Sequence, residues 1–197
     1  IDIQLTVPSN FNLDIDTARG NIKVQDLVGN HRAHPASGEV VIVDCPGNHV
    51  VDTASGDAEI IDSDGNHTVD TSSGEIQIKG CNGTIVADST SGDITFREFS
   101  GKVQVDTTSG DVDLDLSSAP LSQDVIVDTT SGDVQLKLHS HLAATLILST
   151  SSGRIRNPFT LDSMDAKNSK HRIRGRIGQN GPTLKIITTS GNIQLIN

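Results

Sequence analysis

Apolar and polar residues alternate along most of the chain in short runs, and the runs recur at a fixed spacing. After each glycine of a Ser-Gly step, the second and fourth residues are apolar, as in Ile76 and Ile78 or in Ile94 and Phe96. Strict alternation places such residues on one face of a β-strand. The pattern therefore predicts many short strands, each with one buried and one exposed face.

Two series of glycines set the spacing of these strands. Within each series neighbouring glycines are 18 residues apart, and the second series follows the first by nine residues. A fixed period of about 20 residues is typical of a solenoid, in which each turn stacks on the next. The series are Gly20, Gly38, Gly56, Gly74, Gly92 and Gly110, and Gly29, Gly47, Gly65, Gly83 and Gly101.

The period predicts the fold class, which is all-β. We expect a parallel β-solenoid with about 18 residues and two strands per turn, and about eight to ten turns. Because the apolar pattern repeats every nine residues and not every six, we favour a flattened coil of two sheets. Equivalent side chains of successive turns should form columns with a spacing of about 4.8 Å.

We interpret the whole chain, residues 1–197, as one domain. Residues 1–16 should form two strands that lead into the solenoid, and residues 17–153 its regular turns. Residues 154–183 have no clear period, so we expect an irregular basic excursion there. Residues 184–197 resume the alternation and predict a last regular turn, whose edge must be capped to prevent association.

Composition and charge argue against several functions. The chain has no Trp or Tyr and only four Phe, so it lacks the flat rings on which sugars and single-stranded bases stack. Its formal net charge of −10 argues against nucleic-acid and anionic-membrane binding, which need a basic surface. We also find no apolar run of the roughly 20 residues that a membrane span requires. Because the chain starts with Ile1, we expect an export signal or anchor to be missing from its start.

The order of motifs resembles a known family. Apolar and polar residues alternate at the N-terminus up to Val7-Pro8, and repeated units of the form Thr-x-Ser-Gly-Asp-Ile follow. The chain closes with the sequence of residues 181–195, Gly-Pro-Thr-Leu-Lys-Ile-Ile-Thr-Thr-Ser-Gly-Asn-Ile-Gln-Leu. These features are similar to the bacterial adhesin-type family catalogued as domain of unknown function 4097. The resemblance implies a parallel β-helix-like fold and a place in the cell envelope. It carries over no catalytic or binding residue to this chain.

Two rows of acidic residues follow the period. The first has His34 and Ser149 in place of an acid, and consists of Asp16, Asp52, Asp70, Asp88, Asp106 and Asp128. The second consists of Asp57, Glu75, Asp93, Asp111 and Asp133. Oxygen-rich corners of this kind can bind divalent cations. We favour the alternative that each carboxylate accepts hydrogen bonds from the amides and hydroxyls of its own turn.

Histidines and cysteines also recur at equivalent positions. His31, His49 and His67 should stack at a sheet margin, where they could bind zinc or sense pH. Later turns have Ile85 and Val103 at the equivalent position of the repeat. Because these residues are apolar, we favour the interpretation that the histidines are half-buried, stacked rings. Three ligands in a straight row would also form a poor tetrahedron.

Cys45 and Cys81 occupy one offset two turns apart. Their Cα atoms should therefore be roughly 9–10 Å apart, beyond the limit of about 7 Å for a disulfide, so we expect two free thiols.

The C-terminal part of the chain is basic, unlike the rest. Residues 1–153 carry 23 acidic and 7 basic side chains, a net charge of −16, whereas residues 154–197 carry 2 acidic and 8 basic side chains, a net charge of +6. This segment could bind an anionic polymer or an acidic neighbour. The alternative that we favour is a loop that folds over the acidic rows of its own chain. Its basic residues are Arg154, Arg156, Lys167, Lys170, Arg172, Arg174 and Arg176.

The sequence favours a non-enzymatic β-solenoid of the cell envelope or the extracellular space, acting as an adhesin-like binding surface or a spacer. Its partner would be an envelope glycan, an envelope protein or another copy, with no cofactor or metal. One alternative is an intracellular scaffold that assembles end to end. The other is a polysaccharide-active β-helix enzyme, which the even, repetitive polar surface argues against.

Overall fold

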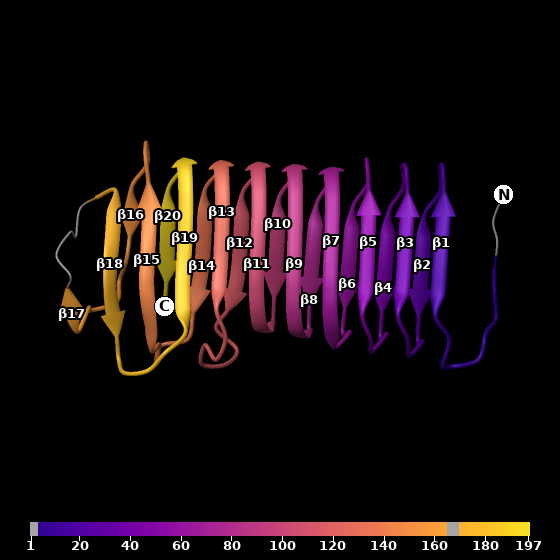
Figure 1. Cartoon of the computed structure of the whole chain (residues 1–197), viewed down its shortest axis with the longest axis horizontal. Coiled ribbons are helices and arrows are strands. Elements are labelled where there is room, and N and C mark those ends of the chain that lie inside the picture. Colours follow the sequence, from indigo (N-terminus) through magenta and orange to yellow (C-terminus); the bar gives the residue numbers. More distant parts are fainter. Residues whose placement is uncertain (1–3, 165–169) are drawn as a thin grey trace.

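The alternating residues form short strands, and the strands build two long sheets that face each other along the molecule (Figure 1). The computed structural model describes residues 4–164 and 170–197. Among these residues there is no helix, and so none that is long and apolar enough to cross a membrane. The all-β solenoid expected from the sequence is confirmed, with turns about 18 residues apart.

The strands of each sheet follow one another along the axis of the solenoid. The first sheet has, in spatial order, β1 (Leu13–Thr17), β3 (His31–Pro35), β5 (His49–Thr53), β7 (Gly65–Ser73), β9 (Asn82–Ser91), β11 (Ser100–Ser109), β13 (Val125–Ser131), β19 (Thr183–Ser190), β15 (Ala144–Thr150), β18 (Arg172–Ile177) and β17 (Ser163–Met164). The second sheet has β2 (Ile22–Gln25), β4 (Val40–Val43), β6 (Ala58–Ile61), β8 (Ile76–Lys79), β10 (Ile94–Arg97), β12 (Val112–Leu116), β14 (Val134–Leu138), β20 (Ile193–Ile196) and β16 (Ile155–Arg156).

Equivalent residues of successive turns pair in parallel and in register. In the second sheet Ile94 pairs with Ile76 on one side and with Val112 on the other. The buried apolar side chains of both sheets fill a narrow, mainly aliphatic core, in which Ile94 and Leu114 are fully buried. Burial of these columns is the main favourable term for such a fold.

The glycine columns form the corners between the two sheets. Gly92 has a φ of +147°, a backbone conformation that residues with a Cβ rarely adopt. A Cβ on Gly92 would also collide with the carbonyl oxygen of Gly74 one turn earlier. Glycine is therefore required at these corners both for its backbone conformation and for the close approach of stacked turns.

The last two turns are exchanged in space relative to their order in the chain. The first seven turns, β1–β2 to β13–β14, follow the sequence. The C-terminal pair then inserts between its predecessors, with β19 paired to both β13 and β15 and β20 paired to both β14 and β16. Residues 184–197 do form a regular turn, as predicted. The expectation that its edge must be capped is wrong, because neighbouring strands cover both of its edges.

The basic excursion contains the strands that cap the first sheet. Strand β18 pairs antiparallel with β15, and β17 pairs antiparallel with β18. Strand β18 can join the sheet because buried Ile173 and Gly175 alternate with exposed arginines. The expectation of an irregular segment is thus corrected for this part, and Figure 1 shows β18 and β17 at the end of the molecule opposite the N-terminus.

The N-terminal residues form one strand and not two. Strand β1 is confirmed, but residues 4–9 are in no strand, and Asn10 makes only an isolated bridge to Val28. Pro8 has no N–H for a ladder, and Leu5 remains 69% exposed. Residues 1–3 of the predicted first strand lie outside the described residues.

Candidate functional site

The first acidic row lies on the outer face of the first sheet. Successive aspartates are register partners, so that Asp70 has Asp52 on one side and Asp88 on the other, and the row continues through Asp106 to Asp128. Burial, and then the neighbours Asp106 and Asp70, raise the pKa of Asp88. The row is therefore a regular line of like charges on an exposed surface, whose mutual repulsion the fold must offset.

The hydrogen bonds expected for this row are not formed at its centre. Among the described residues, no hydrogen bond or ion pair involves the side chains of Asp70, Asp88 or Asp106. Asp52 has one close polar neighbour, since its Oδ2 lies 3.6 Å from Nδ1 of His34. The outer row thus has no structural role as a set of turn acceptors.

Carboxylates of the second acidic row do accept backbone hydrogen bonds, although the donors belong to a neighbouring turn and not to the same turn. The backbone amide of Glu75 donates to Oδ1 of Asp57 at 2.9 Å, and the amide of Asp133 donates to Oδ1 of Asp111 at 2.8 Å. The same bond links Asn192 to Asp133. Asp57, Asp111 and Asp133 therefore each join a corner to the corner of a neighbouring turn, which corrects the expectation that they serve their own turn. Glu75 does serve its own turn, because it accepts from Nε2 of Gln77.

The three histidines form a buried stack. Ring centroids of His31 and His49, and of His49 and His67, are 4.9 Å apart, with interplanar angles of 5° and 8°. All three are buried and His49 is 0% exposed, which is deeper than the half-buried position expected. Because the rings are parallel, their lone pairs do not converge on one point as a tetrahedral zinc site requires.

Each imidazole of the stack is held by one hydrogen bond at Nε2. Nε2 of His49 lies 2.6 Å from the carbonyl oxygen of Cys45, and His31 and His67 make the same contact with Leu27 and Ser63. A carbonyl only accepts, so each Nε2 carries the proton and donates it. Each Nδ1 is buried without a partner. Burial lowers the pKa of His49 to about 4, against the opposing effect of its hydrogen bond to Cys45.

The two cysteines are free, as the sequence predicts, and both are buried. Ser63 lies between them in the column, where its hydroxyl accepts from the amide of Cys45 at 3.0 Å and its own amide donates to Sγ of Cys81 at 3.4 Å. Burial raises the pKa of the Cys81 thiol to about 11. The thiol is therefore protonated at neutral pH and poorly suited to nucleophilic chemistry.

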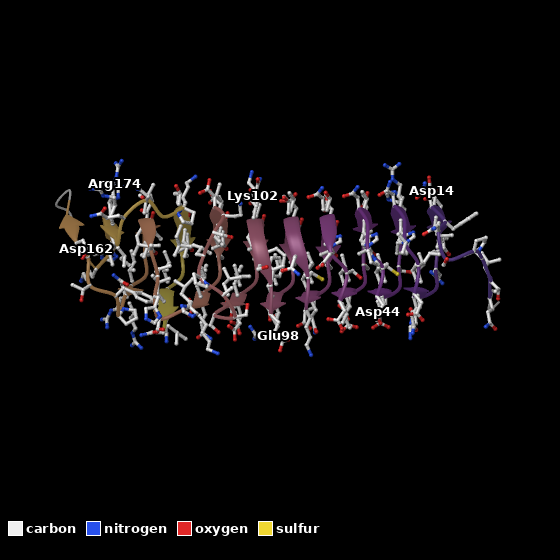
Figure 2. The ribbon with its side chains drawn as sticks, turned by 90° about the horizontal axis from the view of Figure 1, so that it is seen from below. Asp14, Asp44, Glu98, Lys102, Asp162 and Arg174 are labelled. Atoms are coloured by element: carbon white, nitrogen blue, oxygen red, sulfur yellow. The ribbon has the colours of Figure 1, made fainter. Side chains whose placement is uncertain are left out.

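The basic residues gather at the capped end of the solenoid. Arg172, Arg174 and Arg176 alternate on the exposed face of β18, and Figure 2 shows Arg174 at the opposite end of the molecule from Asp14. Arg156 is exposed on β16, at the same end of the second sheet.

This strand does not fold over the acidic row, as the favoured interpretation expected. Strands β19 and β15 separate β18 from Asp128, the last acid of the row. Arg154 and Lys170 are also exposed, whereas Lys167 lies outside the described residues.

Two features were not recognised in the sequence. A column of hydroxyls is buried just inside the acidic row, and Oγ1 of Thr71 and of Thr107 has no hydrogen-bond partner among the residues that the structure describes. The sequence signal for this column was the repeated Asp-Thr pair. Because side chains alternate along a strand, an exposed aspartate places the threonine that follows it in the core. The other feature is an open hollow of about 390 Å³ at the N-terminal end, lined among others by Asp16, His34 and Asp52.

The geometry defines a parallel β-solenoid with an acidic body and a basic, capped end. No curated protein and no solved structure was found to match the chain. Its sequence does match a protein family over residues 2–196. The chain belongs to this family, Toastrack DUF4097, a domain of unknown function, as the motifs of the sequence indicated.

Proposed function

We propose that this chain is a non-enzymatic β-solenoid of the cell envelope, and that its basic end binds an anionic envelope polymer. One observation carries the proposal: exposed arginines stand together at one end of an otherwise acidic molecule. Arg174 projects from the first sheet and Arg156 from the second, at the same end. The acidic body would repel a polyanion while the basic end attracts it, so the body acts as a spacer.

The scaffold supports a binding role more than a catalytic one. The outer surface presents regular columns, such as the row through Asp70, Asp88 and Asp106. Catalysis needs groups that converge on one reacting atom. A straight row on a flat sheet does not converge, whereas it suits contact with an extended partner.

Charge reversal at the basic end tests the proposal. We expect the full chain to sediment with cell-wall sacculi that retain phosphate-bearing polymers, and not with sacculi from which these polymers have been extracted. In the double variant R156E/R174E, affinity should fall roughly tenfold or more, because two attractive charges become repulsive. Binding should also weaken with added salt.

The matched control is Lys102→Glu, since Lys102 is exposed on β11 in the acidic body (Figure 2). This variant should bind like the unmodified chain. Equal binding to both kinds of sacculi, or equal losses in the two variants, would contradict the proposal. Fractionation of cells that make the tagged full-length protein tests the location, and recovery only in the cytosol would contradict it.

A second candidate function is end-to-end assembly into a scaffold. It is favoured by the opposite charges of the two ends, with Asp14 and Asp16 on β1 and the arginines on β18. Sedimentation velocity over a range of protein and salt concentrations separates the two functions. A monomer that is independent of both variables argues against assembly.

A further inference from the structure

Near the N-terminal end of the molecule, a histidine replaces one aspartate of the first acidic row. His34 stands between Asp16 and Asp52, where every turn from the third to the seventh has an aspartate. The imidazole is half-buried on the outer face of β3. It has no part in the core or in the corner hydrogen bonds, so the solenoid does not require it.

This substitution creates a cluster of mixed ligands. One oxygen each of Asp14 and Asp16 and one ring nitrogen of His34 all lie within 4.8 Å of one another. Asp14 and Asp16 are two apart on β1, so their side chains share its outer face, and His34 is the register partner of Asp16 on β3. Three ligands at about 2.1 Å from one ion are roughly 3.4 Å apart in a tetrahedron. Small rotations of these exposed side chains would bring them to that spacing.

The surroundings favour a cation at this cluster. Asp52 lies on the far side of the imidazole, with Oδ2 3.6 Å from Nδ1 of His34. Carboxylates are common outer partners of metal-binding histidines. Arg32 is the register partner of Asp14, but among the described residues it forms no ion pair with either aspartate.

The cluster also borders the open hollow. Asp16, His34 and Asp52 line it together with Pro35 and Ala36. Its volume of about 390 Å³ leaves room for water or another small ligand beside an ion. Only three protein ligands are offered, so further coordination positions would be filled from this side.

We propose that Asp14, Asp16 and His34 bind one divalent transition-metal ion, such as Zn²⁺, at the edge of this hollow. The nitrogen ligand distinguishes the site from the rest of the row, because imidazole suits transition metals whereas carboxylates alone suit Ca²⁺ and Mg²⁺. The inference is independent of the basic end and of the function proposed for it.

Titration calorimetry of the full chain with ZnCl₂ at pH 7.5 tests the site. We expect one saturable strong site, with Zn²⁺ bound at least tenfold more tightly than Ca²⁺. Either His34→Gln or Asp16→Asn should weaken Zn²⁺ binding at least tenfold, because each removes one of three ligands. Visible absorption of Co²⁺ bound to the same site should disappear in His34→Gln.

Asp88→Asn is the matched control, since Asp88 belongs to the same row but has no imidazole neighbour. It should leave the strong site unchanged. Equal losses in Asp88→Asn and His34→Gln would show ions spread along the row and would overturn the proposal. Absence of saturable Zn²⁺ binding would also overturn it. Circular dichroism without metal checks that each variant is folded.

Discussion

The position of a residue in the repeat decides its environment in this protein as much as its own chemistry does. The histidine stack shows this, because His31, His49 and His67 occupy the positions that Ile85 and Val103 fill in later turns. The sequence predicted the column, since i and i+18 must be neighbours in a solenoid of this period. It did not predict the depth of burial, because that depends on how closely the two sheets approach.

Burial of His49 makes the stability of the fold depend on pH. His49 is neutral when folded, with a pKa of about 4 against an ordinary 6.5. The stability that neutral His49 contributes is therefore fully present above pH 6.5. It is lost as the pH falls from 6.5 to about 4, because in this range the unfolded chain binds the proton more readily than the folded chain. The loss should reach about 3 kcal/mol in the free energy of unfolding. Denaturant unfolding at several pH values measures it.

The variant His49→Ile serves as the control, since isoleucine occupies this column in a later turn. Its stability should change much less over the same pH range, although carboxylates titrate equally in both proteins. If the two proteins lose the same stability between pH 6.5 and 4, the histidine is not responsible.

At the scale of the element, the corner column explains why the turns can stack so closely. Gly92→Ala should destabilise the protein by about 3 kcal/mol or more, because its Cβ would meet the carbonyl oxygen of Gly74 as well as an unfavourable φ. Gly20→Ala is a matched control. Gly20 also has a positive φ, of +131°, but a Cβ there would have no atom within 4 Å.

The control should therefore lose only about 1 kcal/mol, the cost of the backbone conformation alone. Thermal and denaturant unfolding of both variants give the comparison. Equal losses would mean that stacking contributes nothing at these corners.

The two acidic rows show that a sequence pattern alone does not predict which carboxylates form hydrogen bonds. Both rows are acidic and have the same period. Asp57 nevertheless accepts an amide of the next turn, whereas the Asp70 carboxylate has no hydrogen bond within the described part of the chain. The difference arises because Asp57 follows the corner glycine, where its side chain lies beside the next corner, whereas Asp70 points out from the sheet. Sequence reasoning treated the two rows alike.

At the scale of the whole molecule, the exchanged turns make the C-terminal strands the link between two parts. Strands β13 and β15 have no ladder in common, and each pairs with β19 instead. We expect the double variant L184A/I186A, which removes two fully buried side chains, to lose about 4 kcal/mol or more. Hydrogen exchange should show the loss spreading to β15 and β18.

Strands β5 to β10 should keep their protection, since the turns β11–β12 and β13–β14 lie between them and the inserted turn. The matched variant V40A/I42A, in the second turn, should leave β15 and β18 protected. Retained protection of β15 and β18 in L184A/I186A would contradict the role of β19 as the link.

The amino-acid sequence by itself determined the solenoid, its period, its corners and the columns of aspartate, histidine and cysteine. These follow from local rules, because alternation sets the faces of a strand and a constant turn length makes equivalent residues neighbours. Only the tertiary structure decided the order of the last turns, the cap of β18 and β17, and the meeting of Asp14 and Asp16 with His34. The strands of residues 144–156 and 183–197 both fit the edge of the seventh turn, so the choice depends on competition across the whole chain, which no local pattern encodes.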